Sequence, residues 1–121
     1  MSGKDRRFGF RVPVEFFLDK YVGDRRFRVL AQNLSETGIR VSRAGRLPSG
    51  TRSVAMEIAL PGDGESIWAR GEIRVNEAGE LCEDSGIKFT AMAKSHARKL
   101  RDFCVERRKS HLGHLLSAIA R

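Results

Sequence analysis

Polar and apolar residues alternate one by one over long parts of this chain, and this alternation constrains the fold more than any other feature. A repeat of two residues is typical of a β-strand with one buried and one exposed face. The repeat is clearest at 54–60 and 67–75, which are separated by a run of turn residues. The apolar positions of these runs are Val54, Met56, Ile58, Leu60, Ile67, Ala69, Gly71, Ile73 and Val75. We therefore expect two neighbouring strands whose apolar positions all face a core.

Further strands are predicted on both sides of this pair, so that the chain has six in all. The other runs cover 11–19, 25–34, 39–43 and 81–90. Gly23 and Asp24 predict a hairpin between the first two strands. Pro13 has no backbone N–H, so the first strand should begin at a sheet edge or a bulge. Short antiparallel strands at this spacing favour a small barrel or a sandwich, because closure removes exposed sheet edges.

The last thirty residues have the repeat of a helix instead. One apolar stripe, which should lie against the barrel, consists of Ala93, Ala97, Leu100, Phe103 and Cys104. A second stripe consists of Leu112, Leu115, Leu116 and Ile119. Gly113 weakens the link between the stripes by roughly 1 kcal/mol relative to alanine, so 110–121 is either an extension of the same helix or a separate short one. The second stripe is expected to pack on the barrel or on another protein, including a second copy of this chain.

Length, charge and cysteine content limit the function. The 121 residues fit one domain, and no apolar run is long enough to span a bilayer or to form a signal peptide. A cytoplasmic protein is therefore predicted. Cys82 and Cys104 have no metal-binding spacing and are expected to be reduced, packed thiols. The net charge of +8 predicts an anionic partner, which could be a nucleotide, a nucleic acid or an acidic protein surface.

Two short segments carry the functional signal. The polar hexapeptide at 33–38, Asn-Leu-Ser-Glu-Thr-Gly, interrupts two predicted strands and would by itself indicate an ordinary turn. Upstream, Arg7 and Arg11 stand four residues apart in a basic N-terminal arm. A turn with small and amide side chains, together with an arginine arm, can form a site for purines and phosphates.

The two segments together resemble the paired signature of PilZ domains, RxxxR followed by (D/N)xSxxG. The resemblance covers roughly 5–108 and includes the strand around Gly86 and the helix that follows. It implies a bacterial receptor for cyclic di-GMP, built as a six-stranded antiparallel barrel closed by a C-terminal helix. Together with the basic composition of the N-terminus and the second apolar stripe, it divides the chain into a flexible basic arm at 1–11, a barrel with its helix at 12–108, and a helical extension at 109–121. Cyclic di-GMP would be the ligand, and no other cofactor is expected.

The resemblance also assigns the ligand-binding residues. Arg7 and Arg11 are expected to contact phosphates and the Hoogsteen edge of guanine, because the planar guanidinium can donate two parallel hydrogen bonds. Arg6 could add a phosphate or stacking contact, or could remain a solvated residue of the arm. The arm is expected to become ordered when the nucleotide binds.

On the barrel, the motif at 33–38 supplies the other contacts. Asn33 can accept a proton from guanine N1 or N2, less strongly than the aspartate that the motif also admits. Ser35 can bind a phosphate oxygen or the exocyclic amine. Gly38 permits either a positive φ or a close approach to the ligand.

Other residues indicate no catalysis and no metal site, so an enzyme is not expected. His96, His111 and His114 lack ligand partners at metal-binding spacing and are predicted to be surface residues. Trp68 faces outward, where it could stack on a base or pack under the helix. Two alternatives to the nucleotide receptor remain open: an adaptor that binds proteins, as a homodimer or with an unknown partner, and a small-barrel nucleic-acid binder. The last is disfavoured because one outward aromatic makes no stacking platform.

Overall fold

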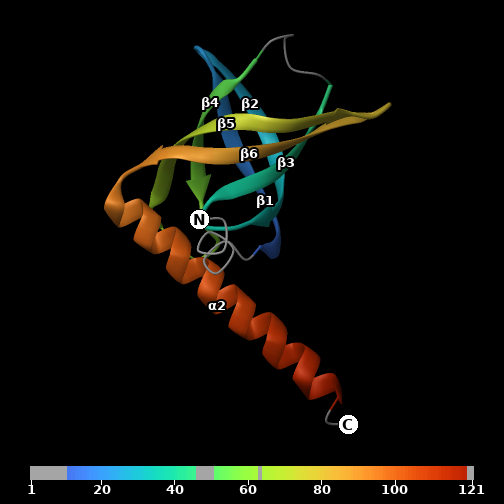
Figure 1. The fold of residues 1–121 in the computed structure, drawn as a ribbon, viewed down its shortest axis with the longest axis vertical. Helices are drawn as coiled ribbons and strands as arrows, with labels where there is room; N and C mark the ends of the chain where they lie inside the picture. Colours follow the sequence, from blue (N-terminus) through green and yellow to red (C-terminus); the bar gives the residue numbers. More distant parts are fainter. Residues whose placement is uncertain (1–10, 46–50, 63, 120–121) are drawn as a thin grey trace, which may run out of the picture.

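A computed structural model describes residues 11–45, 51–62 and 64–119 of the chain (Figure 1). The arm residues Arg6 and Arg7 lie outside the described residues. The strands are β1 (Val12–Val22), β2 (Arg25–Leu34), β3 (Gly38–Ala44), β4 (Ser53–Ala59), β5 (Ser66–Ala78) and β6 (Cys82–Met92), and one helix follows, α2 (Lys94–Ile119).

The six strands form a closed antiparallel barrel, which decides between the two predicted architectures. Its order is β1-β2-β3-β6-β5-β4, with β4 pairing back onto β1. The predicted hairpin is present, and Gly23 adopts a φ of 62° at its turn. The pairing of β1 with β2 shifts between Pro13 and Phe16, which confirms the bulge predicted from Pro13.

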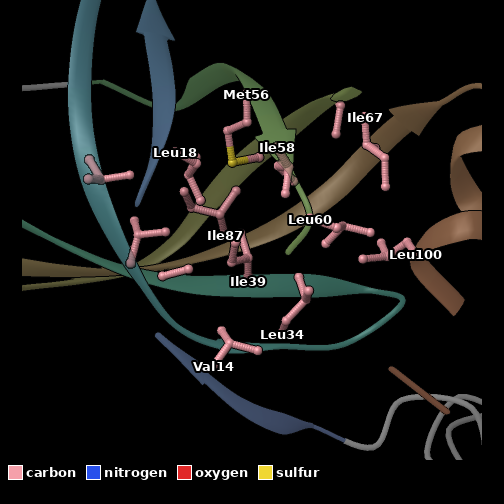
Figure 2. Close-up of a cluster of buried hydrophobic side chains, with 14 of the residues drawn as sticks. Val14, Leu18, Leu34, Ile39, Met56, Ile58, Leu60, Ile67, Ile87 and Leu100 are labelled. Carbon is pink, nitrogen blue, oxygen red and sulfur yellow. The ribbon is translucent and has the colours of Figure 1, made fainter. Parts of the chain in front are cut away.

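The alternating apolar residues fill the inside of the barrel, as predicted. Figure 2 shows Leu18, Met56 and Ile87 from different strands meeting in this core. Gly71 is needed here because a Cβ at this position would lie 2.4 Å from Cγ2 of Ile87. The core therefore has room for the Ile87 side chain only because Gly71 has no side chain of its own.

One buried-face prediction fails, and one buried residue was not predicted. Val75 is half exposed, because the pairing of β5 with β6 shifts between Ile73 and Val75 and reverses the alternation. Lys20, which the prediction left unassigned, is fully buried at the inward position that follows Leu18.

Helix α2 is continuous from Lys94 to Ile119, so the 110–121 stretch extends the same helix as far as it is described. Leu100 and Cys104 are its buried residues and contact the barrel core. Ala93 and Ala97 of the predicted stripe are exposed. The C-terminal end of the helix projects away from the barrel (Figure 1), and the second stripe, Leu112, Leu115, Leu116 and Ile119, is exposed. Packing of this stripe on the barrel is therefore not observed.

Candidate functional site

The turn between β2 and β3 is built around Ser35, whose side chain is buried. Its hydroxyl accepts hydrogen bonds from the backbone N–H groups of Thr37, at 3.2 Å, and of Gly38, at 3.1 Å. The hydroxyl also lies 3.1 Å from the Thr37 hydroxyl and 3.3 Å from the Gly38 carbonyl oxygen. A hydroxyl has two acceptor lone pairs and one proton. The two backbone N–H groups occupy both lone pairs of the Ser35 hydroxyl, so a ligand could bind this hydroxyl only by accepting its proton.

Gly38 brings β3 unusually close to β6. A Cβ at this position would lie 2.5 Å from the carbonyl oxygen of Ile87, a distance that no real side chain tolerates. Its φ is not positive, since the described glycines with positive φ are Gly23, Gly45 and Gly62. Of the two predicted reasons for a glycine here, the positive φ is wrong. The close approach that the structure shows is to the chain's own backbone.

Residues from the predicted motif line an open cavity of about 460 Å³ on the barrel wall. Arg11 enters it from just before β1, and Asn33 enters it from β2, where Asn33 is the cross-strand partner of Pro13. The rest of the wall comes from the turn and from β3, β5 and β6. The full lining is Arg11, Asn33, Ser35, Thr37, Gly38, Ile39, Arg40, Arg74, Val75, Gly86, Ile87 and Lys88. The structure thus brings together Arg11, Asn33, Ser35 and Gly38.

The lining is basic and, among the residues that the structure describes, contains no carboxylate. Arg40 is ion-paired with Glu77 at 2.6 Å, and Arg74 with Glu72 at 2.9 Å. Over the described ranges, neither Arg11 nor Lys88 makes an ion pair. The cavity therefore presents positive charge that an anion can neutralise, with two arginines held in place by acidic neighbours outside the lining.

Arg40, Arg74 and Lys88 were not predicted as site residues. Alternation does put Arg40 and Arg74 on outward faces, but it does not tell which outward residues become neighbours. That follows only from the strand order, in which β3 and β5 flank β6. These three residues can therefore be assigned to the site only once the strand order of the barrel is known.

Helix α2 lies beside the turn of the motif. Arg101 Nε is 4.0 Å from a carboxylate oxygen of Glu36. Burial, with a smaller contribution from the negative charge of Glu36, raises the pKa of the Cys104 thiol to about 12. Cys104 is therefore a packed, protonated thiol as predicted, whereas Cys82 is exposed and not packed.

Trp68 and His96, which were predicted to lie on the surface without a functional role, contact each other. The backbone N–H of Trp68 donates a hydrogen bond to Nδ1 of His96, at 3.1 Å, which ties the first turn of α2 to β5. Trp68 is 47% exposed and its ring lies 5.8 Å from that of Tyr21, so it is not isolated on the surface. No group of three or more potential metal ligands occurs among residues 11–45, 51–62 and 64–119. The helix within these ranges is not long and apolar enough to cross a membrane.

Comparison with known proteins identifies the fold. Among solved structures, the chain is similar to the motility inhibitor MotI/DgrA of Bacillus subtilis, with a TM-score of 0.73 and 19% identity over 84% of this chain and 51% of that one. It is also similar to the PilZ domain of YcgR from Escherichia coli, solved with c-di-GMP, with a TM-score of 0.68 and 14% identity over 91% of this chain and 97% of that one. PlzA of Borreliella burgdorferi, in complex with c-di-GMP, gives a TM-score of 0.59 and 13% identity over 85% and 43% of the two chains.

At these identities the solved structures establish the fold alone, and this chain spans about half the length of MotI/DgrA. No curated protein matches the sequence. The family itself follows from a sequence profile, that of the PilZ domain, which matches residues 5–106 and so covers both motifs, the six strands and the part of α2 that packs on the barrel. The chain belongs to the PilZ domain family.

Proposed function

We propose that this protein is a receptor for cyclic di-GMP, and that binding reorganises the N-terminal arm and the surrounding surface to regulate a partner protein. One observation carries the proposal: the predicted residues Arg11, Asn33, Ser35 and Gly38 converge on one basic cavity, whose described lining residues include no carboxylate. The cavity, at about 460 Å³, lies within the 300–1,000 Å³ range of small-molecule sites. The YcgR domain and PlzA, which share the fold, were solved with c-di-GMP.

Each motif residue has a distinct role in this proposal. Arg11 binds a phosphate or the guanine edge through its guanidinium, and Arg7, with Arg6, adds further contacts from the arm. Asn33 accepts a proton from guanine through its amide oxygen. Ser35 orders the turn with its two lone pairs and can redirect its proton from the 3.3 Å contact with the Gly38 carbonyl to the ligand.

Calorimetric titration with cyclic di-GMP tests the proposal, with GTP and single-stranded RNA as competing ligands. Arg11→Ala should weaken binding roughly ten- to hundredfold, because a lost charged contact costs about 1.5 to 3 kcal/mol. Arg26→Ala is the matched control, since Arg26 is exposed near the β1–β2 turn and does not line the cavity. Absence of binding by the parent protein, or unchanged affinity of Arg11→Ala, would reject the proposal.

The change in the arm has its own test. Binding should slow hydrogen exchange and proteolysis of residues 1–10, because the ligand supplies contacts for Arg6 and Arg7 that offset the entropy lost when the segment is fixed. The Arg11→Ala variant, at the same nucleotide concentration, is the control. Equal protection with and without nucleotide would contradict a ligand-dependent arm.

One observation favours the alternative of a protein-binding adaptor that needs no nucleotide. The second stripe of α2 is unpartnered, with exposed fractions from 44% at Leu112 to 79% at Ile119. Exposed apolar patches usually mark contact surfaces. Binding of RNA in the titration above would instead favour the nucleic-acid alternative, for which the Tyr21–Trp68 pair is the available aromatic surface.

A further inference from the structure

A second cavity lies between the start of β1 and the middle of α2. Its volume is about 320 Å³, and it is lined by Pro13, Arg107, Ser110, His111 and His114. None of these residues lines the larger cavity described above. Neither PilZ motif contains them.

The helical residues that line this cavity are all potential hydrogen-bond donors. The four residues share one face of α2, because Ser110 and His111 lie three and four residues after Arg107 and His114 lies three residues after His111. Within 11–45, 51–62 and 64–119, no carboxylate lines the cavity. The nearest acid in sequence, Glu106, is ion-paired with Lys109 at 3.8 Å, and neither of these two residues belongs to the lining.

Arg107 is held in a defined position without being neutralised. Its guanidinium lies over the ring of Phe103, 5.1 Å from the centroid. Among the described residues, no carboxylate pairs with Arg107, His111 or His114. A stacked guanidinium keeps its N–H donors available at its edge, so an oxyanion can still bind there.

The second cavity adjoins the proposed nucleotide site. Pro13, in its wall, is the cross-strand partner of Asn33, and Arg11, two residues earlier, lines the larger cavity. The contact of Arg101 with Glu36 keeps α2 next to the turn that carries Ser35. The segment 11–13 therefore has the motif residues on one side and the basic face of α2 on the other.

We propose that Arg107, Ser110, His111 and His114 form a phosphate-binding site on α2. Arginine, imidazole and hydroxyl donors around a cavity that has no acid among its described lining residues fit a phosphate group. The phosphate comes from cyclic di-GMP bound in the adjoining cavity, and only this choice of source rests on the proposed function. Such binding links the nucleotide directly to the helix that bears the exposed stripe.

The three histidines of the chain provide an internal measurement, because NMR resolves their ring protons. Cyclic di-GMP should shift the ring signals of His111 and His114. His96, which accepts a hydrogen bond from Trp68, lies outside the lining and should keep its signals. Inorganic pyrophosphate, titrated separately, probes the site without a nucleoside.

Variants on α2 test whether the residues that line this cavity contribute to the affinity for cyclic di-GMP. Arg107→Gln, and the double change His111→Gln with His114→Gln, should each weaken cyclic di-GMP about five- to tenfold, as expected for one lost charged contact at a surface. Arg98→Gln removes an exposed arginine of the same helix outside the lining and should leave the affinity unchanged.

The outcomes separate this inference from the proposed function. If pyrophosphate shifts His111 and His114 and cyclic di-GMP does not, the phosphate site stands and its source is free phosphate. If cyclic di-GMP binds with an Arg11-dependent affinity, yet neither ligand moves the two histidines and Arg107→Gln binds normally, the inference is wrong and the receptor function is untouched. If neither ligand produces binding or shifts, both fail.

Discussion

Lys20 is the most strongly perturbed base in the barrel. Its side chain is fully buried, and its Nζ has no hydrogen-bond partner within the described part of the chain. Burial and, to a smaller extent, the positive charge of Arg43 lower the pKa of Lys20 from 10.5 to about 8, while the negative charge of Glu83 partly opposes them. Glu83 is itself buried and accepts a hydrogen bond from Asn76 at 3.0 Å.

This shift predicts a pH dependence of stability. Unfolded Lys20 keeps its proton until about pH 10.5, whereas folded Lys20 loses it near pH 8. Between these values the unfolded state binds more protons, so the free energy of unfolding should rise as the pH is raised from 8 to about 10.5. Below pH 8 the charged ammonium is a full penalty to folding.

Lys20→Met removes this penalty while keeping a side chain of similar length. Urea unfolding at pH 7 should show a gain of about 3 kcal/mol, from about 1.4 kcal/mol per pKa unit over the shift from 10.5 to about 8. The gain should shrink at pH 9.5, because the parent lysine is then neutral when folded. A loss of stability at pH 7 would mean that the attraction between Lys20 and Glu83 outweighs the cost of burial.

Lys20 lies two residues after Leu18 and continues the inward positions of β1, but the predicted strand ended at residue 19 and left Lys20 unassigned. A lysine at the end of a predicted strand is usually solvated, so nothing local distinguishes this one. Its environment includes Arg43 and Glu83 from strands far along the chain, and only the closed barrel brings them together.

The strands themselves could be predicted well because their signal is local. A two-residue repeat is contained within each strand, and the prediction of 25–34 coincides with β2. Bulges are not contained in the repeat, since they depend on how two strands pair. This is why Val75 was assigned to the core and is exposed, and also why it could come to line the ligand cavity.

The contact between β3 and β6 depends on Gly38. Gly38→Ala should destabilise the protein by about 1 to 3 kcal/mol, because the new Cβ meets the Ile87 carbonyl oxygen at 2.5 Å and that atom belongs to backbone. Thermal or urea unfolding measures the effect. The loss should appear without nucleotide, since it concerns the sheet and not the ligand.

Gly113→Ala is the matched control for the same change of residue. An added Cβ there meets nothing within 4 Å, and Gly113 lies inside α2. Alanine should therefore stabilise the helix by up to about 1 kcal/mol. If Gly38→Ala stays within a few tenths of a kcal/mol of the parent protein, the strands have room to separate and the proposed constraint is wrong.

Across the whole molecule, the sequence predicted four of the twelve described residues that line the candidate site. The motif residues Asn33, Ser35 and Gly38 could be predicted from the sequence because they are close in sequence and share a turn. Arg74 and Lys88 enter the cavity from β5 and β6, so their contribution depends on long-range pairing. The sequence also did not predict whether α2 is continuous, because the helix stability lost at Gly113 is compatible with both a break and a continuous helix.

The continuous helix makes a prediction about its two apolar stripes. Leu100 is fully buried against the barrel, whereas Leu115 and Leu116 are 47% and 64% exposed on the part that projects away. Burial, not hydrophobicity alone, determines the stability lost on substitution. Leu100→Ala should therefore cost about 2 to 5 kcal/mol, while Leu115→Gln with Leu116→Gln should change the free energy of unfolding by less than about 0.5 kcal/mol.

The same double variant tests whether the second stripe is a contact surface, because it leaves Arg107, His111 and His114 in place. Sedimentation velocity over a range of concentrations should show the parent protein associating and the variant remaining monomeric if a second copy covers the stripe. If both stay monomeric, a second copy is rejected and a different protein is the remaining partner. A large loss of stability in the variant would instead mean that the stripe packs within the chain, contrary to its exposed position on α2.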